Sequence, residues 1–158
     1  MKNLLLTHGN IRKSKKLRHY FLDFGDERFQ KDLAEYFERI KSESEFLKIY
    51  DKLHDSKFKI IEERNKVIFD LNLAQSGEAA RLIFDGGKIV SFNSVKQNGH
   101  ISRLNKNVIA QEYGYEDIYS EFGKKYFSLV FFYYEKQKHG RSSKALLTIQ
   151  YKTLRVEK

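Results

Sequence analysis

The sequence predicts an α+β fold in which an antiparallel sheet of about five to six strands packs against two N-terminal amphipathic helices. Three observations lead to this fold class. Apolar residues recur at helical spacing between residues 26 and 55, short alternating segments follow between residues 57 and 95, and residues 126–156 are rich in aromatic and β-branched side chains. The 158 residues are expected to form a single domain, 1–158, without an internal repeat.

The helical pair follows a basic N-terminal arm, residues 1–20, whose first seven residues are expected to form a short strand. Phe29, Leu33, Phe37 and Ile40 stand four, four and three positions apart, which places them on one face of a helix over residues 26–42. A second amphipathic segment covers residues 43–54.

Strands are predicted at residues 57–61, 66–73, 78–84 and 88–95, because apolar and polar residues alternate there between turn-forming sequences. The last two flank Asp85-Gly86-Gly87, a tight-turn sequence. A small helical insert is expected over residues 108–112 and 116–122, broken at Gly114. A long C-terminal hairpin, residues 126–156, is predicted last, with arms at 126–134 and 145–156.

Charge is concentrated at the two ends of the chain, although the net charge of the whole is +9. Residues 1–20 contain six cations and no acids, and residues 136–158 contain seven cations and one acid. Between them, residues 21–135 carry a net charge of −3. Cations gathered in this way favour a small nucleic-acid-binding protein. The residues expected to contact phosphates are Arg12, Lys13, Lys15, Lys16 and Arg18 in the arm, and Lys136, Lys138, Arg141 and Lys144 in the hairpin tip.

Aromatic residues beside these cations favour RNA over DNA, since unpaired bases stack on exposed rings. Tyr133, Tyr134 and Tyr151 are the candidates for such stacking. On the last strand, Tyr151 and Lys152 are expected on opposite faces, so only one of them can face a ligand.

An alternative is a metal-independent endoribonuclease of the toxin type, which needs an acid/base and cations around the phosphate but no metal. His139 and Arg141 are its candidate catalytic residues, and His100 and Arg103 form a second pair of this kind. The predicted order of strand, two helices and antiparallel strands is similar to that of RelE-like toxin ribonucleases. That resemblance concerns topology only, and no motif transfers catalytic residues to this chain.

A third interpretation is a phage or mobile-element inhibitor that binds a host nucleoprotein such as a defence nuclease, with the acidic helices occupying its nucleic-acid channel. No cofactor is expected. No metal is expected either, because the five histidines lack metal-ligand spacing and cysteine is absent. The longest N-terminal apolar run, Leu4–Leu6, is too short for a signal peptide or a membrane span, so we expect no membrane association and a cytoplasmic location.

Overall fold

The computed structural model describes residues 26–95, 101–103, 111–134 and 142–158; the arm at 1–20 and most of the hairpin tip lie outside these ranges. The described helices are α4 (Asp26–Ile40), α5 (Ser44–Leu47) and α6 (Tyr50–Leu53). The described strands are β1 (Lys57–Glu63), β2 (Lys66–Asn72), β3 (Ala79–Asp85), β4 (Lys88–Val95), β5 (Ile101–Arg103), β6 (Gln111–Glu121), β7 (Lys124–Tyr134), β8 (Ser142–Tyr151) and β9 (Thr153–Glu157).

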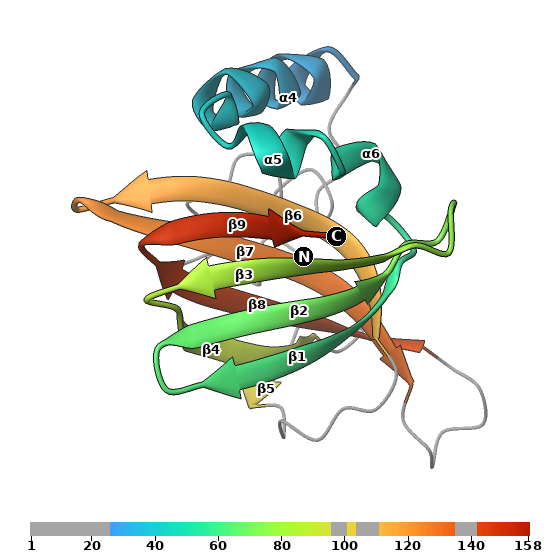
Figure 1. Cartoon of the computed structure of the whole chain (residues 1–158). Helices are drawn as coiled ribbons and strands as arrows, with labels where there is room; N and C mark the ends of the chain where they lie inside the picture. The colour runs from blue at the N-terminus through green and yellow to red at the C-terminus, as the bar shows by residue number, and fades with distance from the viewer. Residues whose placement is uncertain (1–25, 96–100, 104–110, 135–141) are drawn as a thin grey trace.

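The predicted fold class is confirmed, because helices precede one sheet in which all paired strands are antiparallel. The predicted strand number is too low: the described ranges contain nine strands, in the order β5-β4-β8-β7-β6-β1-β2-β3-β9. Figure 1 shows the three helices together on one side of this sheet. None of the described helices is long and apolar enough to cross a membrane.

The sheet curls on itself, since the chain changes its pairing partners abruptly between β8 and β9. β8 pairs with β4 and β7, whereas β9, which begins only one residue after β8, pairs with β3. The expected second hairpin arm at 145–156 is therefore two strands separated by Lys152. The amide of Lys152 donates to the Asp85 carbonyl at 3.0 Å, joining this bend to the β3–β4 turn. Gly86 fits that turn because it has a φ of +64°.

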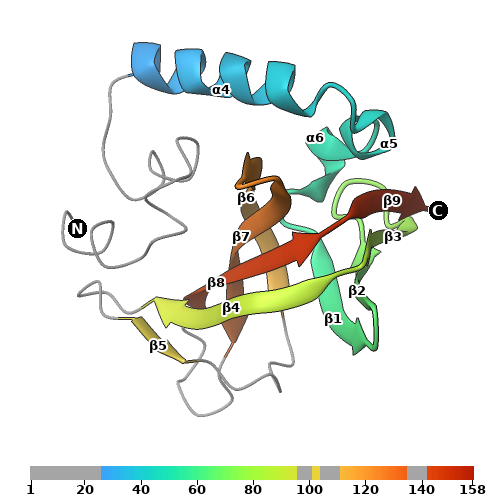
Figure 2. The same ribbon diagram turned by 90° about the vertical axis from the view of Figure 1, so that its left-hand side faces the viewer.

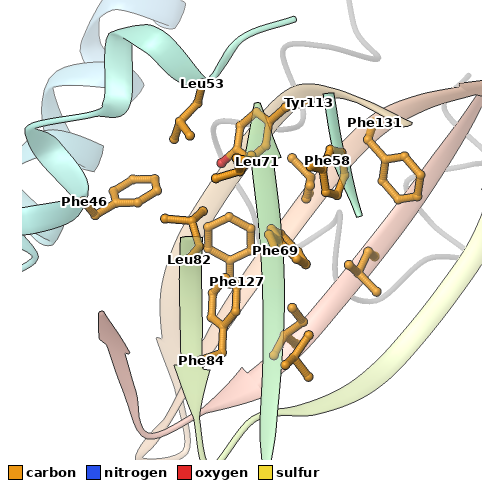
Figure 3. Close-up of a cluster of buried hydrophobic side chains, with 14 of the residues drawn as sticks. Phe46, Leu53, Phe58, Phe69, Leu71, Leu82, Phe84, Tyr113, Phe127 and Phe131 are labelled. Carbon is orange, nitrogen blue, oxygen red and sulfur yellow. The ribbon is translucent and has the colours of Figure 1, made fainter. Parts of the chain in front are cut away.

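Aromatic rings fill the inner face of the curled sheet (Figure 3). Phe127 of β7 lies at their centre, with ring centroids 4.8 Å from Phe84, 5.9 Å from Phe69 and 6.2 Å from Phe46. All four rings are at most 1% exposed. Edge-on aromatic pairs of this kind add to the free energy gained by burial alone, so this cluster holds the two halves of the sheet and α5 together.

The first predicted helix is confirmed as α4, but the second is divided into α5 and α6. The amide of Ile49 bonds to the carbonyl of Phe46, three residues back, instead of continuing the α-helical ladder. This break allows Phe46, Ile49 and Leu53 all to reach the core, where each is 1% exposed.

The predicted helical insert is wrong, because residues 111–121 form strand β6. The register between β6 and β7 shifts between Tyr113 and Tyr115, which places Gly114 in a β-bulge. A Cβ atom at Gly114 would lie 2.4 Å from the Val130 carbonyl oxygen, so only glycine fits. The bulge reverses which residues face the core, and this hides the alternation that marks a strand.

The β6–β7 turn holds a bulky residue in a strained conformation. Phe122 and Gly123 occupy the two central positions with φ values of +48° and +72°, a combination that favours asparagine and glycine. A side chain such as phenylalanine is disfavoured there, and the Phe122 ring is 92% exposed, so packing does not offset the strain.

Replacing Phe122 with asparagine is therefore expected to stabilise the fold. Asparagine tolerates the left-handed conformation, so we expect a gain of about 1 kcal/mol in the free energy of unfolding. This corresponds to a rise of roughly 2–4 °C in Tm for a chain of this size. Thermal unfolding followed by circular dichroism measures it, and a lower Tm than that of the wild type would contradict the assignment of strain.

Candidate nucleic-acid interface

The ends of five strands meet at one end of the sheet, here called the basic end. The cross-strand pairs Ile101–Val95, Val95–Lys144, Ser142–Tyr134 and Tyr133–Gln111 run across β5, β4, β8, β7 and β6 in sequence. The β7–β8 ladder remains paired up to Tyr134 and Ser142, which confirms the predicted hairpin. The segments between these strand ends therefore start and finish at the basic end.

The sequence at the basic end is strongly cationic. Residues 95–111 contain three cations and no acids, and residues 134–144 contain four cations and one acid. The strand ends that flank these two stretches, Val95 and Gln111 for one and Tyr134 and Ser142 for the other, therefore lie at the same end of the sheet. The contribution of residues 95–111 was missed, because it depends on strand order.

Helices α4 and α5 contact the middle and the far end of β6 and β7. The Tyr36 hydroxyl donates to Glu116 and Arg39 donates to Asp117 in the middle of β6, while Lys125 at the far end of β7 donates to Glu43. Closer to the basic end, the amide of Asp55, two residues after α6, donates to the carbonyl of Tyr113 on β6. Residues 26–53 contain eight acids and six cations. In Figure 2 the helices lie above the sheet, while β5 and the end of β4 lie below them. Helices α4 and α5 are therefore displaced from the basic end, whereas the end of α6 lies closer to it.

Most of the predicted contact residues lie outside the described ranges. These are Arg12, Lys13, Lys15, Lys16, Arg18, Lys136, Lys138 and Arg141, together with the catalytic candidate His139. Lys144 is described and exposed, and its ammonium group lies 5.9 Å from the centroid of the Phe132 ring. A lysine held over an aromatic ring keeps its charge at the protein surface.

Two of the predicted stacking residues are in the core instead. Tyr133 is 2% exposed, and its hydroxyl shares a 2.9 Å hydrogen bond with Ser94. Tyr151 is 4% exposed and packs edge-on against Phe84. Neither ring is open to a base, because both point to the inner face of the sheet. Lys152 is exposed, but it lies in the bend between β8 and β9, so the expected alternation of Tyr151 and Lys152 along one strand does not apply.

The opposite end of the sheet holds an aromatic and basic surface that the sequence analysis missed. Here called the turn-end patch, it consists of Lys88, Phe122, Lys124, Tyr126, Gln150 and Lys152. Tyr126 is half-buried, and its ring stacks on the buried ring of Tyr119, the residue paired with it on β6, with centroids 5.4 Å apart. The three lysines are exposed, and none forms an ion pair with another described residue. The two-residue turn before Lys124 is a sequence signal that indicates this hairpin.

Buried carboxylates form the main polar cluster under the helices. Glu116 is 3% exposed and accepts a 3.0 Å hydrogen bond from Tyr36, while Asp117 is fully buried and lies 2.6 Å from the Arg39 guanidinium. Burial, reinforced by the nearby Glu116 carboxylate, raises the pKa of Tyr36 and of Tyr113 well above the ordinary value. These contacts fasten α4 to β6, which indicates a structural role.

Four tyrosines make the fold sensitive to alkali. Burial raises the pKa of Tyr119 to about 12, and burial also raises the pKa of Tyr36, Tyr113 and Tyr151. The pKa of a tyrosine in the unfolded chain is near 10. A tyrosine whose pKa is higher in the folded state stabilises the fold fully below that pH, and this stabilisation is lost as the pH rises through the pKa of the folded state. We therefore expect unfolding between about pH 10 and 12.

Circular dichroism and tyrosinate absorbance, recorded together from pH 8 to 12, test this expectation. The four buried tyrosines should ionise only as the fold is lost. The variant Tyr151→Phe removes a hydroxyl that forms no hydrogen bond in the described part of the chain, and should unfold at higher pH. Ionisation of all ten tyrosines near pH 10 in a protein that stays folded would contradict the prediction.

No group of three potential metal ligands occurs among the described residues. His54 is described: its Nδ1 atom lies 3.1 Å from Asp55, and its ring packs edge-on against Tyr115. The ribonuclease and inhibitor interpretations stay predictions, the first because its catalytic pair, His139 and Arg141, lies outside the described ranges.

Comparison with known proteins gives no further information on function. No protein-family model, curated protein or solved structure matches the chain.

Proposed function

We propose that this protein binds nucleic acid, RNA in preference to DNA, through the basic end of its sheet and the basic N-terminal arm. The phosphate-contacting residues in this proposal are Arg12, Lys13, Lys15, Lys16 and Arg18, together with Lys136, Lys138, Arg141 and Lys144. Lysine and arginine side chains that neutralise phosphates supply most of the affinity of such complexes, largely irrespective of sequence.

The strand register at the basic end is the observation that carries the proposal. The pairs from Val95 to Lys144 and from Tyr134 to Ser142 set side by side the strand ends that flank two basic stretches, and these stretches contain seven cations and one acid in the sequence. Helices α4 and α5 contact another part of the sheet, so their acids do not neutralise this charge locally.

Fluorescence anisotropy with a labelled 20-nucleotide RNA of mixed sequence tests the proposal at low salt. We expect saturable binding, weaker binding to a DNA of the same sequence, and competition by unlabelled RNA. An acidic protein such as albumin should not compete. Unchanged anisotropy at protein concentrations well above 10⁻⁴ M, the weak limit of non-specific binding, would overturn the proposal.

A further inference from the structure

We infer that the turn-end patch is a second nucleic-acid contact, in which Phe122 stacks on an unpaired base of a single strand. The inference rests on the proposed function and adds that the nucleic acid is single-stranded where it contacts this patch. It is drawn from the described residues of the β6–β7 turn and its neighbours, which lie at the end of the sheet opposite the basic end.

The conformation of Phe122 is the first observation. Its φ of +48° is disfavoured for a bulky side chain, and its ring is 92% exposed, so the fold gains nothing evident from this residue. A strained residue that does not serve packing indicates a function outside the fold. Nothing lies within 4 Å of the Cβ position at Gly123, so there is open space beside the ring.

The chemistry around the turn is the second, independent observation. By register, Lys124 and Tyr126 lie on the face of β7 opposite Phe127, and Gln150 is paired with both Tyr126 and Lys88. Tyr126 is half-buried against the buried Tyr119, so the exposed ring of the patch is that of Phe122. With Lys152 the patch has three exposed lysines, and its neighbouring acids include Glu121 and Asp85, whose carboxylate is paired with Arg155. Exposed rings beside cations are the combination that binds single strands, because bases stack on the rings while phosphates meet the charges.

This composition favours a nucleic acid over a protein partner. Protein–protein interfaces are enriched in aromatic residues but depleted in lysine, whereas this patch combines an exposed aromatic ring with three lysines. The two proposed contacts lie at opposite ends of β7, whose eleven residues span about 35 Å. One nucleic-acid strand can reach both contacts if it has at least about ten nucleotides, spaced as they are when stacked in a helix.

Tryptophan fluorescence tests the inference, because the chain has no tryptophan and Phe122→Trp places a single reporter at the turn. We expect a 20-nucleotide oligouridylate to quench this emission over the concentration range in which anisotropy reports binding. A 20-base-pair RNA duplex should not quench it, because its bases are already stacked. Phe122→Asn should weaken oligouridylate binding by about 5- to 150-fold. Ile61→Thr, a change at another exposed apolar residue, should leave the affinity unchanged.

The outcomes separate the inference from the proposed function. Oligouridylate binding that is equal in the wild type and Phe122→Asn, without quenching of the tryptophan emission in Phe122→Trp, overturns the stacking contact and leaves the proposed function intact. Equal quenching by the duplex also overturns it. A blue shift of the emission with rising protein concentration, in the absence of RNA, assigns the turn to self-association instead. A wild-type protein that binds none of the nucleic acids overturns both proposals.

Discussion

Replacing Phe127 with alanine is expected to lower the free energy of unfolding by about 3–5 kcal/mol. The ring is completely buried and packs against Phe46, Phe69 and Phe84. Its removal leaves a cavity among rings that come from α5 and from both halves of the sheet, so the lost contacts cannot be replaced by a small local movement. Urea unfolding followed by circular dichroism measures the change.

Ile61→Ala is the matched control for this prediction, since Ile61 is 37% exposed on β1. We expect it to change the free energy of unfolding by about 0.5 kcal/mol or less. If Phe127→Ala were no more destabilising than this control, the aromatic cluster around Phe127 would not be the core of the fold.

Removing three charges at the basic end, two from the hairpin tip and one, Lys144, from β8, is expected to weaken RNA binding strongly. The triple variant Lys136→Gln, Lys138→Gln and Lys144→Gln should bind more weakly to every sequence, because phosphate contacts are independent of the bases. Its salt dependence should also become shallower, by roughly 2–3 units in the slope of log affinity against log salt. Anisotropy titrations at several salt concentrations measure both effects.

The helices supply a control with the same change in net charge. Lys31, Lys41 and Lys48 are exposed in α4 or next to α4 and α5, and their replacement by glutamine also removes three cations. If RNA binds locally at the basic end, this second triple variant should have nearly the same RNA affinity as the wild type. The slope of its log affinity against log salt should also be nearly unchanged. Equal losses in the two variants would mean that only the net charge matters, without a defined site.

The sequence predicts best where local patterns and tertiary contacts agree. In β2, the alternation of Val67, Phe69 and Leu71 with more exposed neighbours correctly indicates a strand with one buried face. The hairpin of β7 and β8 was predicted from its aromatic and β-branched residues. The register of Tyr134 with Ser142 confirms the hairpin and shows that its second arm begins at Ser142, three residues earlier than predicted.

The prediction fails where the pattern depends on distant partners. Strand β6 was taken for helical turns because the Gly114 bulge shifts its alternation, and because Glu116 and Asp117 are buried in contact with Tyr36 and Arg39 of α4. The division of the last arm at Lys152 has a similar origin, since β9 pairs with β3, about seventy residues earlier in the chain.

The candidate interface was predicted only in part. Charge counting found the basic hairpin tip, because charge is a property of composition. It did not find the neighbouring stretch at residues 95–111, since that depends on which strands are adjacent. Tyr133 and Tyr151 were misplaced because a tyrosine on a strand suits either a core or a binding surface, and the choice follows from the curl of the sheet.

The salt dependence of RNA affinity tests the central claim most directly. If the basic end and the N-terminal arm together make about six phosphate contacts, log affinity should fall against log salt concentration with a slope of roughly −4 to −5. With about six contacts, raising the salt concentration from 50 to 200 mM should lower the affinity by several orders of magnitude. A slope near zero over this range would contradict nucleic-acid binding through these cations.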